Sequence, residues 1–310
     1  MWPTAVALAL VLVATGGVAA SLFVRRPLAV LAWLGRRSLR RAGLAMHRRQ
    51  TPSGPVVFFE GGAGPTLAFL HGAGDQAGSW ARTVRPLVRR FHVVVPDLPG
   101  HGDSAPANGP LPMETFLAGA SAVLDEVTVA VPAIIVGHSL GAWVATLYAA
   151  RRPERVARLV LVNGGAILGE RSDVNLMPRD RAEAARVLAE LRDPSSPKVP
   201  GYLLDDIVRQ ANAGPIARMA AAAATLPPFL MDGRLGSIAI PVDLLWGESD
   251  RMMPVAYARR MLEAFPAARL TMIPRCGHVP QHESPRGFRA ALDGVLAAGP
   301  PATRPAETSA

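Results

Sequence analysis

Three residues of the chain have the types and the order of a serine-based catalytic group. Ser139 lies in the pentapeptide Gly137-His138-Ser139-Leu140-Gly141, and Asp250 and His278 lie farther along, each shortly after an apolar run. A serine hydroxyl is a poor nucleophile unless a base removes its proton, and a histidine base needs an acid to fix its tautomer. The sequence therefore predicts Ser139 as nucleophile, His278 as base and Asp250 as acid.

The surroundings of Ser139 predict how its hydroxyl is presented. An apolar run, Ile134–Val136, precedes the pentapeptide, and a helix-like run, Leu140–Arg151, follows it. A serine flanked by glycines between a strand and a helix is typical of a sharp turn that exposes the hydroxyl at the carboxyl end of a sheet. Asp250 and His278 also follow predicted strands, so we expect all three side chains at one edge of a parallel sheet.

The elements that must position these residues alternate along the chain from residue 56 onward. The predicted strands are Val56–Glu60, Thr66–Leu70, His92–Pro96, Ile134–Val136, Val156–Val162, Val242–Trp246 and Leu270–Ile273. The predicted helices between them are Ser79–Arg90, Met113–Val129, Leu140–Arg151, Val255–Glu263 and Ser284–Leu296. This alternation predicts right-handed crossovers and an α/β fold with a mostly parallel sheet flanked by helices.

The alternation stops between Gly164 and Ser237, where helix-like runs are separated by prolines. An all-helical insertion of this length after a central strand is longer than a loop and predicts a helical cap over one end of the sheet. The predicted organisation is a membrane segment at residues 1–24, a basic juxtamembrane tether at 25–54, an α/β core at 55–163 and 238–297, the cap at 164–237 and a disordered tail at 298–310.

The N-terminal segment has the length of a membrane span. Residues 2–24 contain no charged side chain, and as a helix they would reach about 34 Å, enough to cross a hydrocarbon core of about 30 Å. Eight arginines between Arg25 and Arg49 favour a cytoplasmic location for the rest of the chain. The alternative is a cleaved secretory signal, which would make the protein secreted or periplasmic, although such a signal carries its positive charge before the apolar run.

A second apolar patch, Pro27–Leu34, lies between two pairs of arginines. The patch is too short to span a bilayer, so it predicts either a helix that lies on an anionic lipid surface or a flexible basic tether. In the first case, membrane lipid is a partner of both the N-terminal helix and its Arg-rich flank.

The net charge of +9 comes almost entirely from the N-terminal arginines, because the first acidic residue is Glu60 and the rest of the chain is nearly neutral. A nucleic-acid surface needs basic residues spread over the folded domain, so no nucleic-acid partner is predicted. The single cysteine, Cys276, excludes an internal disulfide framework. No phosphate-binding loop, dinucleotide motif or paired Cys/His spacing occurs, so neither a cofactor nor a metal is predicted.

Three further segments complete a known pattern. His71-Gly72-Ala73-Gly74 follows one predicted strand, Asp97-Leu98-Pro99-Gly100-His101-Gly102-Asp103-Ser104 follows the next, and Gly247-Glu248-Ser249-Asp250 with Pro254 carries the acid. With the serine pentapeptide, these segments resemble the capped, serine-nucleophile branch of the α/β-hydrolase fold family, which is esterase- or lipase-like, over about residues 55–297. Ala73 stands where the HGGG motif of some lipases has a glycine.

The resemblance implies a role for each matching residue. Ser139 attacks an acyl carbonyl, His278 takes its proton, and Asp250 orients His278. The backbone N–H groups of Ala73 and Leu140 hold the oxyanion. The oxyanion loop and the nucleophile turn are further shaped by His71, Gly72, Gly74, Gly137, His138 and Gly141. The expected protein is an enzyme without a cofactor that cleaves a small-molecule carboxylic ester with an apolar acyl or alcohol part through an acyl-enzyme intermediate.

Several alternatives stay open from the sequence. His282 is a rival base and Glu248 a rival acid. The same group could hydrolyse a carbon–carbon bond or transfer an acyl group to an acceptor other than water, because fold and catalytic group do not set the substrate. A non-catalytic, membrane-tethered binding protein is an alternative of another class. Trp80 and Trp143 could line an acyl pocket or belong to the core.

Overall fold

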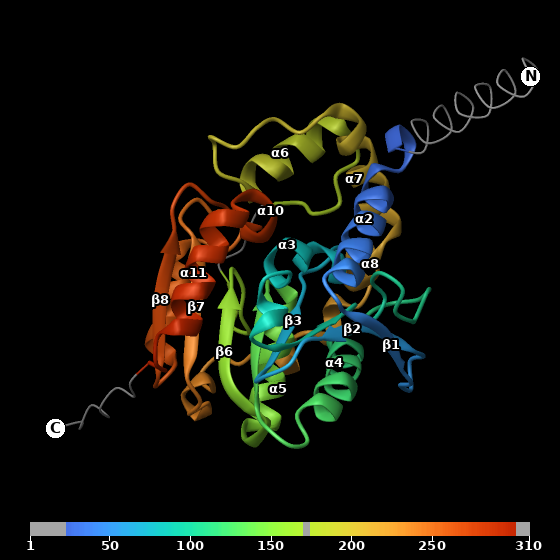
Figure 1. Cartoon of the computed structure of the whole chain (residues 1–310). Helices are drawn as coiled ribbons and strands as arrows, with labels where there is room; N and C mark the ends of the chain where they lie inside the picture. The colour runs from blue at the N-terminus through green and yellow to red at the C-terminus, as the bar shows by residue number, and fades with distance from the viewer. Residues whose placement is uncertain (1–22, 170–173, 302–310) are drawn as a thin grey trace, which may run out of the picture.

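The structure, a computed structural model, describes residues 23–169 and 174–301. Its centre is an eight-stranded sheet with the strand order β1-β2-β4-β3-β5-β6-β7-β8 (Figure 1). The strands are β1 (Ala45–Arg49), β2 (Val56–Gly61), β3 (Thr66–Leu70), β4 (His92–Pro96), β5 (Ala133–His138), β6 (Val156–Val162), β7 (Val242–Gly247) and β8 (Ala268–Ile273). β2 pairs antiparallel with β1 and β4, and the other pairs are parallel, so the predicted mostly parallel α/β sheet is confirmed.

Helices cover both faces of the sheet and bury two apolar cores (Figure 1). Along β2, Phe58 belongs to one core and Phe59 to the other, because successive side chains of a strand point to opposite faces. The first core packs against α4 (Met113–Val127), α5 (Leu140–Arg151) and α9 (Val255–Ala264), and the second against α2 (Pro27–Arg41), α3 (Ala81–Val84) and α11 (Pro285–Ala297). Shorter helices are η1 (Ala77–Trp80), η2 (Leu87–Arg89), η3 (Pro153–Arg155) and α10 (Pro280–Glu283).

The register of the parallel strands aligns their carboxyl ends. Leu70 at the end of β3 is paired with Gly137 of β5, and His138 of β5 is paired with Val162 of β6. Val162 is paired in turn with Leu245, near the end of β7. The turns after these strands therefore meet at one edge of the sheet, which is where α/β proteins bind their ligands.

The segment predicted as a cap folds into short helices beyond that edge. They are α6 (Arg181–Leu191), α7 (Gly201–Ala213), α8 (Pro215–Ala220), η4 (Ala223–Thr225), η5 (Pro227–Phe229) and η6 (Leu235–Ser237). Asp180 begins α6 by accepting a hydrogen bond from the N–H of Glu183. Figure 1 shows α6 and α7 above the carboxyl ends of the strands, with α7 beside α2.

The tether predicted for residues 25–54 is corrected by the structure. Residues 27–41 form the helix α2, and residues 45–49 form β1, which pairs with β2 at the edge of the sheet. Leu39 and Leu44 are buried in the second core, and that burial stabilises a segment whose arginines suggested a solvated linker. The α/β core therefore begins before residue 55.

The membrane segment predicted at residues 1–24 lies outside the described residues except for Phe23 and Val24. Among the helices of residues 23–169 and 174–301, none is long and apolar enough to cross a membrane. Most of the tail predicted at residues 298–310 also lies outside the described part, which ends at residue 301.

Candidate active site

Ser139 lies in a strained turn between β5 and α5. Its φ of 50° and ψ of −115° fall in a region that costs a non-glycine residue about 1–3 kcal/mol. The turn is crowded, since a Cβ on Gly141 would lie 2.3 Å from the carbonyl oxygen of Leu70 and one on Gly137 would lie 2.4 Å from that of Gly141. Only glycine fits these two positions, which explains the spacing of the pentapeptide.

The structure brings the three predicted residues together. His278 Nε2 lies 3.1 Å from Ser139 Oγ, and His278 Nδ1 lies 2.8 Å from Asp250 Oδ2. Asp250 and His278 are buried, and Ser139 is partly exposed. With its proton on Nδ1 facing the carboxylate, His278 presents the lone pair of Nε2 to the serine hydroxyl, as a general base must.

Asp250 is held by groups that the sequence did not single out. Its Oδ2 also accepts a hydrogen bond of 2.6 Å from Nδ2 of Asn163, and its Oδ1 accepts from the backbone N–H groups of Met252 and Met253. Asn163 follows β6 and has a φ of 45°, a conformation that asparagine tolerates better than most residues. A polar residue at the carboxyl end of a central strand was the one sequence signal for Asn163.

The loop after β3 lies directly beside the nucleophile. A Cβ on Gly72 would lie 3.2 Å from Cβ of Ser139. In the part of the chain that the structure describes, no hydrogen bond uses the N–H groups of Ala73 or Leu140. Two unused N–H donors beside a serine hydroxyl can receive a developing oxyanion.

Hydrogen bonds from the next turn hold this loop. His71 Nε2 accepts from the N–H of Leu98, and His101 Nε2 accepts from the N–H of Gly74 at 3.0 Å. Burial lowers the pKa of His101 to about 3, so its ring stays neutral and can accept. Both histidines therefore hydrogen-bond to the backbone and join the two turns.

His138 contacts the loop of the base rather than the serine. Its Nε2 donates to the carbonyl oxygen of His278 at 2.7 Å, and its Nδ1 accepts from Nε2 of the buried Gln281. Burial lowers the pKa of His138 to about 3, and the neighbouring His278 contributes to this shift. Gln281, which sequence reasoning missed, thereby fixes the tautomer of a neutral His138.

The rival groups lie apart from this arrangement. His282 Nε2 pairs with Asp75 Oδ2 at 3.0 Å, and the side chain of Glu248 is exposed. The negative charge of Asp75 and its hydrogen bond to the ring raise the pKa of His282. Burial raises the pKa of Cys276 to about 12, which keeps that thiol protonated.

The two tryptophans have different positions. Trp80 is fully buried in the second core against Phe69 and Phe288. It is a core residue, and the alternative that it lines an acyl pocket at Ser139 is wrong. Trp143 is partly exposed on α5, and its Nε1 donates to the carbonyl oxygen of Phe229 in the cap. Trp143 therefore lies between the nucleophile helix and the cap.

The cap is tied to the loops that carry the base and the acid. The N–H of His278 donates to the carbonyl oxygen of Leu191, the last residue of α6, at 2.7 Å. Ser249 Oγ donates to Asp193, and Glu283 accepts from the N–H groups of both Asp193 and Gly277. A change in the position of the cap would therefore displace the imidazole of His278 through the backbone of that residue.

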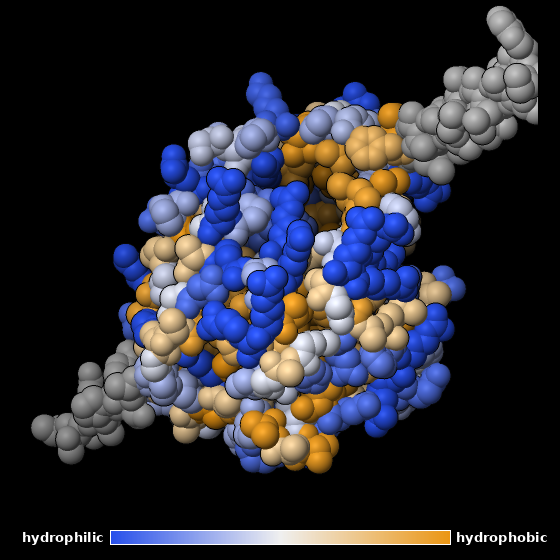
Figure 2. Space-filling view, viewed as in Figure 1, coloured by the Kyte–Doolittle hydropathy of each residue, from blue (hydrophilic) through white to orange (hydrophobic). Residues whose placement is uncertain are grey.

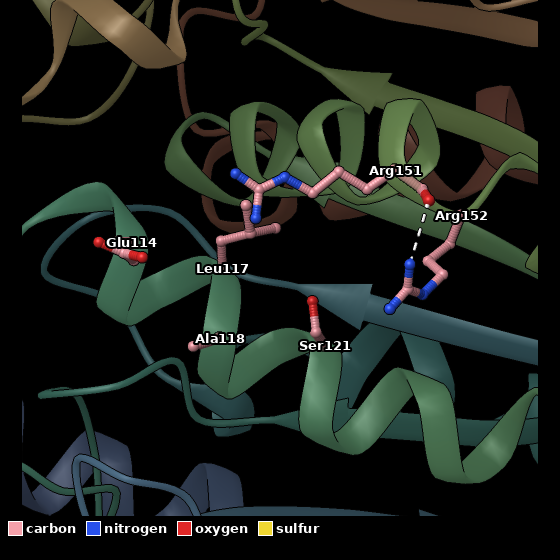
Figure 3. A pocket seen from close by; sticks show the side chains of 6 residues that line it. All are labelled: Glu114, Leu117, Ala118, Ser121, Arg151 and Arg152. Atoms are coloured by element: carbon pink, nitrogen blue, oxygen red, sulfur yellow. Dashed lines mark hydrogen bonds between the residues drawn. The ribbon is translucent and has the colours of Figure 1, made fainter.

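A surface pocket between α4 and α5 lies away from this arrangement. It is lined by Glu114, Leu117, Ala118, Ser121, Arg151 and Arg152 (Figure 3). Arg151 ends the 12-residue helix that begins after Ser139, so this side of the pocket is about 18 Å from the serine along the helix axis. Its volume of about 230 Å³ is below the range of roughly 300–1,000 Å³ that is usual for ligand sites. Among the described residues, no three His, Cys, Asp or Glu side chains are grouped to hold a metal ion.

Residues 67–291 match the sequence profile of the alpha/beta hydrolase family. The chain belongs to this family. The match includes the serine turn, the loop after β3 and the loops of Asp250 and His278, and it makes the protein an enzyme of the hydrolase class.

Similar proteins include hydrolases of several kinds. The chain is 32% identical over 252 residues to a 2-hydroxy-6-oxononadienedioate/2-hydroxy-6-oxononatrienedioate hydrolase of Cupriavidus pinatubonensis, covering 74% of this chain and 85% of that protein. It is 29% identical over 252 residues to a pimeloyl-[acyl-carrier protein] methyl ester esterase of Nitrosomonas europaea, covering 76% and 96%. The crystal structure of a membrane phospholipase A, a bacterial virulence factor, superposes with a TM-score of 0.73 at 29% identity, covering 96% of this chain and all of that one.

Proposed function

We propose that this hydrolase is a membrane-anchored serine esterase that cleaves a carboxylic ester with an apolar acyl or alcohol part. The observation that carries the proposal is the hydrogen-bonded series Ser139–His278–Asp250, with the serine in a strained turn beside the unused N–H groups of Ala73 and Leu140. A nucleophile, an oriented base and oxyanion donors are together what acyl transfer requires.

The geometry supports an acyl-enzyme mechanism. Ser139 Oγ attacks the ester carbonyl while its proton passes to Nε2 of His278, and Asp250 stabilises the imidazolium. The carbonyl oxygen becomes an oxyanion that accepts from the N–H groups of Ala73 and Leu140. His278 then gives its proton to the leaving alcohol. In the second half, a water molecule loses a proton to His278 and attacks the acyl group, and His278 returns that proton to Ser139 Oγ as the acid is released.

The cap residues near the loop after β3 favour an apolar substrate. Ile216 of α8 reaches within 3.0 Å of the position that a Cβ on Gly74 would occupy. Met219 and Phe229 of the cap pack against the core together with Trp143. Figure 2 shows a hollow rimmed by apolar residues between the cap helices α6 and α7 and helix α2. An acyl or alcohol chain in this region would bury apolar surface.

A second candidate is the hydrolysis of a carbon–carbon bond, favoured by the identity to the Cupriavidus pinatubonensis enzyme. The substrate named for that relative is a dioate, whose carboxylates would need cationic partners. Arg218 of α8 instead donates to backbone carbonyls of the loop after β4, those of Gly100, Pro106, Asn108 and Gly109. We therefore rank ester cleavage first.

The surface of α2 supports attachment to lipid. Leu31, Trp33 and Leu34 are exposed on it, and the guanidinium of Arg37 lies 5.6 Å from the Trp33 ring centroid. Exposed tryptophan and leucine beside arginines suit the boundary of an anionic bilayer. We infer that residues 1–24 form the anchor, with the catalytic domain on the cytoplasmic side. Alkaline carbonate should leave the full chain in membranes, and release of the chain would contradict the anchor.

The enzymatic proposal is tested with the full chain in detergent, beside its Ser139→Ala variant. A fluorophosphonate probe should label the wild type and not the variant, and an ester series of increasing acyl length should be cleaved with kcat/KM rising with length. A folded wild type that is not labelled would favour a non-catalytic binding protein. Turnover of a vinylogous diketone and of no ester would favour the second candidate.

A further inference from the structure

Helix α2 contacts the end of the oxyanion loop, backbone against backbone. A Cβ on Gly35 would lie 2.6 Å from the carbonyl oxygen of Gly78, and a Cβ on Gly78 would lie 2.8 Å from the backbone nitrogen of Arg36. Gly78 belongs to η1, which begins four residues after Ala73. The contact leaves no room for a side chain between α2 and η1, so a shift of α2 would move η1 with it.

A charged contact acts at the same place. Nη1 of Arg36 lies 3.8 Å from Asp97 Oδ2 and 3.5 Å from Asp103 Oδ1. The buried Asp97 carboxylate accepts from the N–H of Ala77 at 2.7 Å and from that of Asp103 at 3.0 Å. Burial raises the pKa of Asp97, so a nearby guanidinium helps to keep it ionised as an acceptor for η1.

The other end of α2 is fixed to the cap. The buried carboxylate of Asp206 in α7 accepts from the N–H of Leu28 at 2.9 Å, in the first turn of α2. A negative charge beside the N-terminus of α2 also interacts favourably with the helix dipole. Arg209 donates to the carbonyl oxygen of Arg25 and pairs with Asp206. Helix α2 is therefore attached both to the cap and to the end of the oxyanion loop.

From these contacts we propose that α2 positions the oxyanion loop, with Gly35 and Arg36 as positioning residues for the N–H group of Ala73. The inference rests on the proposed serine hydrolase. Its physical basis is that a displacement of about 1 Å at a catalytic group can lower the rate about 100-fold. Because α2 directly follows the predicted anchor, the segment that attaches the enzyme to a membrane is also part of its active-site scaffold.

The test compares Gly35→Ala and Arg36→Gln with the wild type, all as full chains in detergent. Alanine is the better helix former, so Gly35→Ala should remain folded while its methyl group displaces η1. In both variants we expect kcat to fall about 10- to 100-fold while KM changes less than about threefold. The affinity for a trifluoromethyl ketone, whose adduct carries an oxyanion, should fall by the same factor as kcat/KM.

Two matched controls accompany these variants. Gly294→Ala makes the same substitution in helix α11, where the added methyl group meets nothing within 4 Å apart from the nearby backbone of its own helix. Arg37→Gln changes the exposed neighbour of Arg36. Both should keep the wild-type kcat and the wild-type ketone affinity. Arg36→Lys restores a positive charge and should recover part of the loss.

The outcomes separate this inference from the proposed function. A wild type that fluorophosphonate does not label refutes the proposed function itself. A labelled wild type with unchanged kcat and ketone affinity in Gly35→Ala and Arg36→Gln refutes only the positioning role. The positioning role would also be refuted if total activity fell only in parallel with the thermal midpoint while kcat per labelled site stayed unchanged. Helix α2 would then act on stability alone.

Discussion

Replacing Asp250 with asparagine keeps the shape of the acid and changes the direction of its hydrogen bonds. The carboxylate accepts four of them, from the ring of His278, the side chain of Asn163 and the N–H groups of Met252 and Met253. An asparagine has one acceptor oxygen, which the two backbone N–H groups at Oδ1 would retain. Its NH₂ group then faces Asn163 and His278.

The substitution changes the tautomer of His278. With an NH₂ donor opposite Nδ1, His278 must accept there and carry its proton on Nε2, 3.1 Å from Ser139 Oγ. That nitrogen can no longer take the serine proton. The corresponding tautomer error in a serine protease lowers kcat by about 10⁴, and the same factor here is about 5.5 kcal/mol in activation free energy. Two donors facing each other at Asn163 should also lower the free energy of unfolding by about 1–3 kcal/mol.

The assay is turnover of a soluble ester across a pH series, with the thermal midpoint measured on the same samples. Glu248→Gln is the matched control, because Glu248 lies two residues away and is exposed. It should keep the wild-type rate. A rate for Asp250→Asn within tenfold of wild type would refute the argument, since the carboxylate would then not set the tautomer of His278.

Three further predictions concern other buried groups. His278→Ala should abolish ester turnover, whereas His282→Ala should keep it within about tenfold, as steady-state kinetics would show. Unfolded His101 binds a proton below about pH 6.5 and the folded ring only near pH 3, so stability should fall as pH drops through this interval. His101→Gln should flatten that slope by about 1.4 kcal/mol per pH unit in denaturant titrations. Asp243→Ala leaves the buried Arg158 without its partner and should cost about 3–5 kcal/mol in the same titrations.

The principal site residues could be predicted because their signals are local. A strand, a glycine-flanked serine and a helix are adjacent in sequence, and Asp250 and His278 each follow a strand within a few residues. The parallel register then brings these turns together without further information. Side-chain distances follow from the fold and not from spacing, so the sequence predicted which groups meet and not how they are held.

Asn163 and Gln281 could not be predicted in the same way. Asn163 bonds to a residue 87 positions away, and Gln281 bonds to one 143 positions away. Amide side chains are common on protein surfaces, so only the tertiary fold shows that these two are buried against Asp250 and His138. Trp80 illustrates the same difficulty for an aromatic residue, because composition does not tell which of the two cores receives it.

Helix α2 shows that the number of charged residues in a segment does not tell where each charged side chain points. The arginines of residues 25–49 predicted a solvated or lipid-facing segment, yet Arg36 turns inward to Asp97 while its neighbour Arg37 is exposed. Successive residues of a helix point about 100° apart, so one helix can present arginine to a lipid surface and another arginine to a buried carboxylate. If α2 lies on lipid as we propose, its electrostatic attraction to an anionic surface should therefore be weaker than the full block of arginines suggests. Arg36→Gln should therefore lower kcat, whereas Arg37→Gln should weaken the attachment of the protein to anionic vesicles.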